Sequence, residues 1–382
     1  MKFSYSEFSE KYNDPKKAKA VLAKIFEYSN MLGGRGVNLM EVCGTHTHEI
    51  CRSGVRGMLP GNVALRSGPG CPVCVTPDLY IDEAVLMARR KDCVVATFGD
   101  MLKVPGTVSS LAAEKSAGAD VRVVYSPMET LQIAAENPSK NVVFLSVGFE
   151  TTVPSIAITI REAAAQKAGN FYILEGNKTV PEALSAIASH PSVAIDGFIL
   201  PGHVSAIIGS DAYIAPLARA KLPGVVCGFE YMDILLTIEA LVEMIVKKSP
   251  GVKNQYSRVV TAKGNQAAGR AIDEVFELCP ADWRGIGVIQ SSGLKLRGDY
   301  KRFSAAEKFA GTIREAAESV ENKRESGCRC GEVLLSLIEP PECPLFKTTC
   351  DPLNPVGACM VSSEGTCAAY YKYGPSTEKI EF

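Results

Sequence analysis

The chain has 382 residues, a length that predicts two or three domains rather than one core. Hydrophobic residues make up 46% and charged residues 22%, the balance of a globular protein and not of a disordered one. The 41 basic and 42 acidic side chains leave a net charge of −1, which argues against nucleic acid or an anionic membrane as a partner.

Residues 1–20 are charged and polar where a secretion signal needs an apolar stretch, and no segment reaches the roughly 18 uninterrupted apolar residues of a membrane span. We therefore expect a cytoplasmic protein, in which thiols are kept reduced. In that compartment 13 cysteines are more typical of metal ligands, catalytic thiols and core residues than of structural disulfides.

Residues 1–30 are predicted to form an N-terminal helix, because apolar side chains recur at helical spacing from Ala18 to Phe26. Short apolar runs rich in β-branched residues follow, separated by helical stretches. This alternation indicates parallel sheets covered on both faces. Eight strands are predicted, over residues 37–43, 63–66, 93–98, 121–125, 141–147, 171–174, 197–200 and 224–227.

The first four and the last four of these strands repeat one plan. In each half the first and third strands end in a glycine-containing turn, at Gly44 and Gly99 and then at Gly148 and Gly202. We predict an α/β fold with two similar Rossmann-like parallel-sheet domains facing a cleft, where the turns after the strands would meet. The predicted boundaries are 1–30 for the N-terminal helix, 31–135 and 136–258 for the two α/β domains, and 259–382 for a third domain.

From residue 259 onward the pattern changes. Helices are predicted over residues 265–279 and 304–321, and beyond Cys328 the chain is dense in cysteine, proline and glycine. Such a segment is shaped by ligation more than by a hydrophobic core. We therefore predict that residues 259–382 form a helical, cysteine-rich iron–sulfur domain.

Six cysteines fall within 40 residues of this tail: Cys328, Cys330, Cys343, Cys350, Cys359 and Cys367. Four thiolates satisfy a 4Fe–4S or 2Fe–2S cluster, or a tetrahedral zinc ion. The repeated CxxC pairs of a zinc ribbon are absent, which favours iron–sulfur over zinc or idle buried thiols. Cys328 is too close to Cys330 to share one cluster with it without strain, and Cys359 is expected to pack. The predicted ligands are Cys330, Cys343, Cys350 and Cys367.

A second group of chemically active residues is the segment CGTHTH, which lies where a strand is predicted to turn into a helix. The dipole and free N–H groups of a helix N-terminus stabilise a thiolate, the form of Cys43 that binds metal or attacks. His46 and His48 are two of only four histidines in the chain, and they would serve as hydrogen-bond partners or proton donors nearby. The alternative is a packed cysteine followed by capping threonines.

A CxxC pair, Cys71 and Cys74, follows the second predicted strand in the sequence SGPGCPVC. It is typical of redox dithiols, and the glycines before it are expected to carry both sulfurs to an exposed tip. Two unlinked thiols, or a metal site shared with Cys43, are the alternatives. At two other strand ends, Glu150 would offer an acid to the cleft unless it only caps a helix, and His203 would carry protons or bind metal unless its role is structural.

These residues resemble the HypD family of nickel–iron hydrogenase maturation proteins. The resemblance covers essentially the whole chain, and many long motifs match in order, which makes it specific. The motifs are CGTHTH at 43–48, SGPGCPVC at 67–74, TFGDMLKVPG at 97–106, GFETT at 148–152, PGHVS at 201–205, CGFE at 227–230, CRCGEVL at 328–334, PECPLF at 341–346 and NPVGACMVSSEGTCAAYY at 354–371.

The resemblance implies a function that no spacing in the sequence shows. HypD-like proteins form a complex with the small chaperone HypC, whose N-terminal cysteine shares an iron with a HypD cysteine that matches Cys43. The iron acquires two cyanides, through the partner HypE, and one carbon monoxide before the finished group moves to the hydrogenase large subunit. By the same resemblance Cys71 and Cys74 match a redox-active dithiol, and the tail matches a 4Fe–4S site.

The resulting hypothesis is a hydrogenase maturation factor, a scaffold with redox activity rather than a stand-alone turnover enzyme. Two alternatives are a stand-alone iron–sulfur and dithiol oxidoreductase and a zinc-stabilised interaction module. Steady-state turnover without any partner would favour the first alternative. A colourless protein prepared without air would favour the second.

Overall fold

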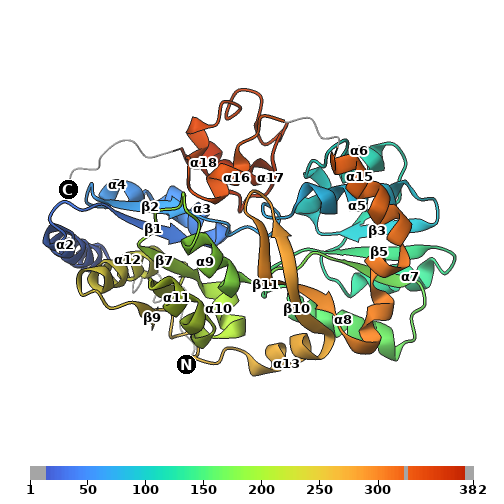
Figure 1. The fold of residues 1–382 in the computed structure, drawn as a ribbon, viewed down its shortest axis with the longest axis horizontal. Helices are drawn as coiled ribbons and strands as arrows, with labels where there is room; N and C mark the ends of the chain where they lie inside the picture. Colours follow the sequence, from blue (N-terminus) through green and yellow to red (C-terminus); the bar gives the residue numbers. More distant parts are fainter. Residues whose placement is uncertain (1–13, 322–325, 375–382) are drawn as a thin grey trace.

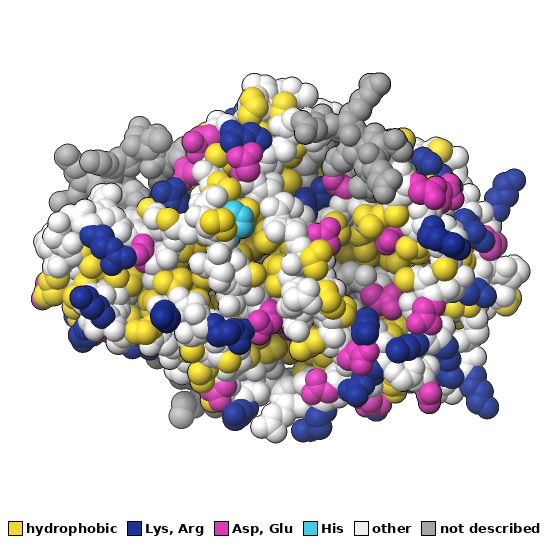
Figure 2. Space-filling model, in the orientation of Figure 1, with side chains coloured by type: hydrophobic (Ala, Val, Ile, Leu, Met, Phe, Trp, Pro, Cys, Tyr) yellow, Lys and Arg dark blue, Asp and Glu magenta, His cyan; other side chains and the backbone are white. Residues whose placement is uncertain are grey.

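The computed structural model describes residues 14–321 and 326–374. They form two α/β units, an antiparallel hairpin with flanking helices, and a tail of short helices that lies over the junction between the units (Figure 1). Within these described ranges no helix is long and apolar enough to cross a membrane. On the face shown in Figure 2, basic and acidic side chains are interspersed over the surface.

Nine of the strands form two parallel sheets, which confirms the predicted α/β class. All eight predicted strands are present with ends within two residues of the expected ones, and β9 is an addition. The first sheet has the order β2 (Val63–Ser67), β1 (Val37–Glu41), β7 (Gly197–Pro201), β8 (Pro223–Cys227) and β9 (Gly251–Asn254). The second has the order β4 (Val121–Val123), β3 (Cys93–Thr97), β5 (Asn141–Ser146) and β6 (Phe171–Glu175).

The strands are grouped differently from the sequence prediction. Strands β1 and β2 join the first sheet, the next four strands form the second sheet, and β7, β8 and β9 join the first sheet again. The predicted boundary between residues 135 and 136 therefore lies inside the second unit, within helix α7 (Glu129–Glu136). The reason is that strands buried on both faces carry no sequence signal for the sheet that they join.

One plan is nevertheless repeated in the topology, but between the two sheets and not between the two halves of the chain as predicted. Numbered along the chain within each sheet, the first four strands have the order 2-1-3-4 in both. That order places a topological switch point between β1 and β7 in one sheet and between β3 and β5 in the other. Ligands of open α/β sheets bind beyond the carboxyl ends of the strands at such points.

Helices cover both sheets. Helix α2 (Pro15–Met31) packs against α12 (Tyr231–Val246) on the first unit, and the part of the predicted N-terminal helix before residue 14 lies outside the described residues. Asp14 caps α2 by accepting hydrogen bonds from two amides of its first turn. The remaining helices of the two units are α3 (Gly44–Ser53), α4 (Val55–Met58), α5 (Asp78–Arg89), η1 (Gly99–Lys103), α6 (Leu111–Ser116), α8 (Val153–Ala165), α9 (Val180–Ala188), α10 (Gly202–Ile208), η2 (Ser210–Tyr213) and α11 (Ile214–Ala220).

Beyond residue 259 the predicted helix over residues 265–279 is too long. Helix α13 (Gln266–Val275) ends earlier, and the following residues form strand β10 (Phe276–Trp283), paired antiparallel with β11 (Gly287–Leu296). Pairing with β11 and the burial of Phe276 and Trp283 override the helical pattern, since strand formation depends on tertiary partners. The buried ring of Trp283 stacks on Phe149 of the second unit with ring centres 5.8 Å apart, which fixes the hairpin to that unit.

The predicted helix over residues 304–321 is divided at Phe309, whose backbone leaves the helical region where its ring is buried. The tail that follows contains only short helices, which agrees with a segment that has little hydrophobic core of its own. The elements of this part are η3 (Gly298–Phe303), α13 (Gln266–Val275), α14 (Ala305–Lys308), α15 (Ala310–Glu321), α16 (Cys330–Leu334), η4 (Pro340–Glu342), α17 (Ala358–Val361) and α18 (Thr366–Tyr373).

Candidate thiol and metal centre

The turns singled out in the sequence follow the strands at the two switch points. Cys43 and His203 come after β1 and β7 of the first sheet, and Asp100 and Glu150 come after β3 and β5 of the second. Because the carboxyl ends of parallel strands meet at one edge of a sheet, the fold brings these residues to the edges where ligands bind.

Cys43 is the N-cap residue of α3, as predicted, but its thiol is buried. Burial raises the pKa of this thiol to about 12, and the amides of His46 and Thr45, which favour the thiolate, oppose that rise only in part. The start of the helix therefore favours the thiolate, as expected, but burial opposes it more strongly. A cation that replaces the thiol proton would remove the cost of burying the charge.

The CxxC loop presses against Cys43. A Cβ atom added to Gly70 would lie 2.2 Å from the backbone nitrogen of Cys43, so only glycine permits this approach. The amide of Gly44 donates a hydrogen bond of 3.0 Å to the carbonyl oxygen of Gly70. The loop and the start of α3 therefore form one rigid contact.

Cys71 and Cys74 are joined in a disulfide. They are 3% and 0% exposed, so the expectation that they lie at an exposed tip is wrong. The tail covers them, and the Sγ atom of Cys74 lies 3.8 Å from the carbonyl oxygen of Ala358 in α17. The sequence could not show this cover because it comes from a segment almost 300 residues further along the chain.

All six tail cysteines line one cavity: Cys328, Cys330, Cys343, Cys350, Cys359 and Cys367. The rest of its wall is apolar, from Val333, Leu345, Phe346 and Met360. Cys328 therefore reaches the same space as Cys330, and Cys359 does more than pack, because its thiol interacts with those of Cys330 and Cys367. The choice of Cys330, Cys343, Cys350 and Cys367 among the six stays a prediction.

The donor set of this cavity fits an iron–sulfur cluster. It offers more than the four thiolates that a cluster requires, in an apolar wall. The amide of Val356 donates a hydrogen bond of 3.3 Å to Sγ of Cys350, the kind of contact that tunes cluster sulfurs. Among the described residues no group of three or more His, Cys, Asp or Glu side chains is placed to hold a single metal ion. A metal site shared by Cys43 with Cys71 and Cys74 stays an alternative.

The two histidines of α3 point to different parts of the molecule. Nε2 of His46 lies 2.9 Å from the carbonyl oxygen of Gly228, and its ring stacks on Phe229. Burial lowers the pKa of His46 to about 4, so this imidazole is neutral near pH 7. Nε2 of His48 instead lies 2.8 Å from the hydroxyl of Tyr373 in α18, which ties the helix to the tail.

The exposed His203 also stacks on Phe229, with ring centres 3.8 Å apart. The first unit thus holds both His203 and His46 against one phenylalanine ring. This arrangement places both beside the Cys43 turn without a side-chain contact to its thiol that the structure records, and their chemical roles stay predictions.

Glu150 lies at the edge of a cleft of about 600 Å³ between α10, α13 and the hairpin. One carboxylate oxygen accepts a hydrogen bond of 2.9 Å from the amide of Val180, and the other is buried with no hydrogen-bond partner among the described residues. Burial raises the pKa of Glu150 to about 7. The residue therefore lines this cleft and also accepts a hydrogen bond from the first turn of α9, and its role as an acid stays a prediction.

Two acids of the site were missed from the sequence. Glu41, the last residue of β1, is fully buried and accepts a hydrogen bond of 3.1 Å from the amide of Cys43. Glu364 of the tail accepts a hydrogen bond of 3.3 Å from the hydroxyl of Thr45. An acid at the end of the apolar run VNLME was a usable signal for Glu41, whereas Glu364 is brought to Cys43 only by the packing of the tail.

The segments that carry the three groups of cysteines contact one another in series. Cys43 contacts the loop that carries Cys71 and Cys74, and Cys74 contacts α17 of the tail. Helix α17 contains Cys359, which lines the thiol cavity. A continuous series of contacts therefore runs from the tail cavity through the disulfide to Cys43, and Figure 1 shows the tail above the junction where these segments meet.

The fold and the site together define an α/β thiol protein in which a cysteine-rich tail packs against the turn that carries a strand-end cysteine. The family model described as "Hydrogenase formation hypA family", HypD, matches residues 16–374. The chain therefore belongs to the HypD family of hydrogenase maturation factors.

Curated relatives match along nearly their whole length. The hydrogenase maturation factor HypD of Escherichia coli K12 is 44% identical over 370 residues, which cover 96% of this chain and 98% of the relative. That of Rhodobacter capsulatus is 41% identical over 371 residues, with the same coverage. A putative hydrogenase expression/formation protein of Methanocaldococcus jannaschii is 39% identical over 357 residues, covering 93% and 98%.

Proposed function

We propose that the chain is a cytoplasmic scaffold with redox activity on which the Fe(CN)₂CO group of nickel–iron hydrogenase is assembled. In this proposal Cys43 holds the iron together with a cysteine of a HypC-like partner. Cyanide arrives through a HypE-like partner, and the finished group passes to the hydrogenase large subunit. The observation that supports the proposal best is the contiguity of Cys43, the Cys71–Cys74 disulfide and the tail thiols.

The iron is cargo, and Cys43 has the chemistry to hold it. A thiolate is a soft ligand suited to low-spin ferrous iron that carries cyanide and carbon monoxide. Binding releases the Cys43 proton, and the surrounding amides of Thr45 and His46 remain as hydrogen-bond donors to the sulfur. The neutral ring of His46 and the exposed ring of His203 flank this turn, and we propose them as proton carriers.

The Cys71–Cys74 pair exchanges electrons two at a time: the disulfide accepts them and the dithiol supplies them. Reduction of Cys71–Cys74 takes two electrons and two protons and gives two thiols. A 4Fe–4S cluster, when bound by four tail thiolates, would supply single electrons. The disulfide lies between the tail cavity and Cys43, which is the position that an electron relay requires.

The test is anaerobic copurification of the full chain with a HypC-like partner, followed by metal analysis and infrared spectroscopy. We expect iron with cyanide and carbonyl bands for the wild type and for Cys51→Ala, a control in the same helix. We expect none for Cys43→Ala. If Cys43→Ala keeps those bands, the assignment of Cys43 as a ligand is wrong. Steady-state turnover without any partner would instead favour a stand-alone oxidoreductase.

A further inference from the structure

Glu41 is a buried carboxylate whose hydrogen bonds all lead to the thiol site. It is 0% exposed at the end of β1, and its Oε2 accepts the amide of Cys43 at 3.1 Å. Its Oε1 accepts the hydroxyl of Thr47, in the first turn of α3. The hydrogen bonds of this carboxylate thus fix both the backbone of Cys43 and the first turn of α3.

The same acid also holds the base of the CxxC loop. Glu41 pairs with Ser67 in the β1–β2 register, which brings the Ser67 side chain beside the Glu41 carboxylate. The amide of Gly68 donates a hydrogen bond of 2.8 Å to the carbonyl oxygen of Glu41. The side chain of Glu41 therefore fixes the start of α3, and its backbone fixes the start of the loop that carries Cys71.

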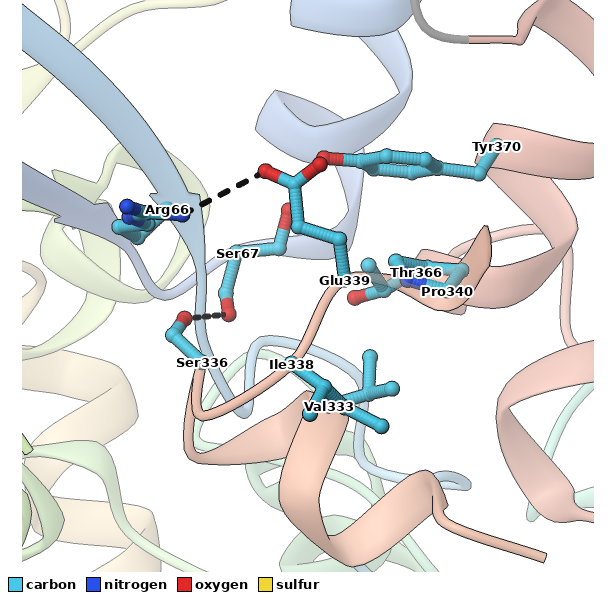
Figure 3. A pocket seen from close by; sticks show the side chains of 9 residues that line it. All are labelled: Arg66, Ser67, Val333, Ser336, Ile338, Glu339, Pro340, Thr366 and Tyr370. Carbon is cyan, nitrogen blue, oxygen red and sulfur yellow. Dashed lines mark hydrogen bonds and ion pairs between the residues drawn. The ribbon is translucent and has the colours of Figure 1, made fainter. Parts of the chain in front are cut away.

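Beyond Ser67 the contacts continue into the tail. Arg56 donates to the Ser67 hydroxyl at 3.3 Å, and its guanidinium lies 5.2 Å from the centre of the Tyr370 ring of α18. The hydroxyl of Ser336 donates to the carbonyl oxygen of Ser67, and Glu339 forms an ion pair of 3.5 Å with Arg66 (Figure 3). These contacts attach the tail to the end of β2 at Ser67, the residue that pairs with Glu41.

A buried acid at the end of β1 lowers the stability of the fold unless its hydrogen bonds offset the cost of burial. Burying a carboxylate carries a large desolvation penalty, and an apolar side chain of similar size would end a buried strand at lower cost. What the carboxylate provides is two oxygens that fix two donors, the amide of Cys43 and the hydroxyl of Thr47, in one geometry beside Ser67.

We propose that Glu41 is a positioning residue that orients Cys43 and couples this orientation to the docking of the tail at Ser67. The consequence for iron rests on the proposed function, but the orientation of Cys43 can be measured without it. Glu41→Gln keeps the shape of the side chain and replaces one acceptor oxygen by a donor NH₂, so either the Cys43 amide or the Thr47 hydroxyl loses its partner.

The test is the rate at which iodoacetamide alkylates Cys43 in the isolated full chain, resolved by mass spectrometry of the peptide that carries it. For Glu41→Gln we expect at least about a tenfold faster rate, with Cys227 unchanged and a melting temperature within a few degrees of the wild type, since a displaced cysteine gains access. Glu175→Gln is the matched control, a strand-end acid of the second sheet, and it should leave the Cys43 rate unchanged.

Two further variants keep the proposal testable if Glu41→Gln fails to fold. Thr47→Val removes one donor to the carboxylate, and Ser67→Ala removes the hydroxyl beside it, so each should raise the Cys43 rate by a smaller factor. Ser336→Ala, in the tail, removes the hydrogen bond to the Ser67 carbonyl oxygen and should raise the rate too.

A wild-type rate for Glu41→Gln, or an equal rise in Glu175→Gln, would overturn the proposal. These outcomes leave the proposed function untouched. Conversely, if the wild type never binds iron with cyanide and carbonyl bands, the proposed function fails while the alkylation rates still decide the role of Glu41.

Discussion

The carbonyl oxygen of Ala358 lies 3.8 Å from the sulfur of Cys74, although 284 positions separate the two residues in the chain. Both are fully buried. Helix α17 therefore covers the disulfide. The tail contacts the CxxC pair and shields it from solvent.

Because α17 covers the disulfide, we expect small reductants to reduce Cys71–Cys74 slowly, since exchange at a disulfide depends on access to its sulfur atoms. Reduction of the native chain by a phosphine should be at least about tenfold slower than reduction in a denaturing concentration of urea. Both rates are measured by trapping the freed thiols with a maleimide and determining the mass of the labelled peptide by mass spectrometry. Equal rates would show that α17 does not shield the disulfide.

Gly70→Ala should destabilise the fold, because the new Cβ would lie 2.2 Å from the backbone nitrogen of Cys43. Overpacking of this kind costs about 1–3 kcal/mol in the free energy of unfolding. Gly61→Ala is the control, since no atom lies within 4 Å of its Cβ position. Urea denaturation of the two variants measures the difference, and equal midpoints would contradict the close contact.

Gly357→Ala should lower the iron and sulfide content of protein purified without air. A Cβ atom at residue 357 would lie 2.4 Å from Sγ of Cys328, so it would displace a thiol of the tail cavity. Gly311→Ala, in α15 with open space around its Cβ position, should retain the wild-type content. If both variants keep it, the cavity is not the site of the cluster.

Stability should fall as the pH rises from about 4.5 to about 7. Burial raises the pKa of Glu83 and Glu175 to about 7 from an unfolded value of 4.5, and the two carboxylates repel each other. The folded chain therefore binds protons that the unfolded chain has lost, so the contribution is complete below pH 4.5 and lost above pH 7. Glu175→Gln should flatten this slope in melting temperatures measured across the range. An unchanged slope would contradict the assignment.

Lys178 should destabilise the fold at neutral pH. Burial lowers the pKa of this amine to about 8 from 10.5, so near pH 7 the folded chain bears a buried charge, and stability rises as the pH increases from about 8 to about 10.5. Lys178→Met keeps a straight chain beside the Trp283 ring without the charge. We expect it to be more stable by about 1–3 kcal/mol at pH 7, as measured by urea denaturation, and the difference should shrink toward pH 10.

The strands and the chemistry of the motifs were predictable from local sequence. Short β-branched runs buried on both faces define strands wherever they pair, so all eight were found. The turns after them were found because glycine, histidine and cysteine stand out at strand ends. The helix over residues 265–279 was overestimated because Phe276 and its neighbours become a strand only when β11 is beside them.

What the local sequence could not determine was which segments meet. The assignment of β3 and β4 to the second sheet depends on pairing between strands far apart in the chain, and apolar side chains do not specify a partner.

The sequence by itself determined that a strand-end cysteine, a CxxC pair and a cysteine-rich tail exist, because residue type and spacing carry that information. Only the tertiary structure decided that the CxxC pair is buried, that all six tail thiols face one cavity, and that Glu41 and Glu364 flank Cys43. Those facts depend on burial and on contacts between distant segments, which arise from packing of the whole chain.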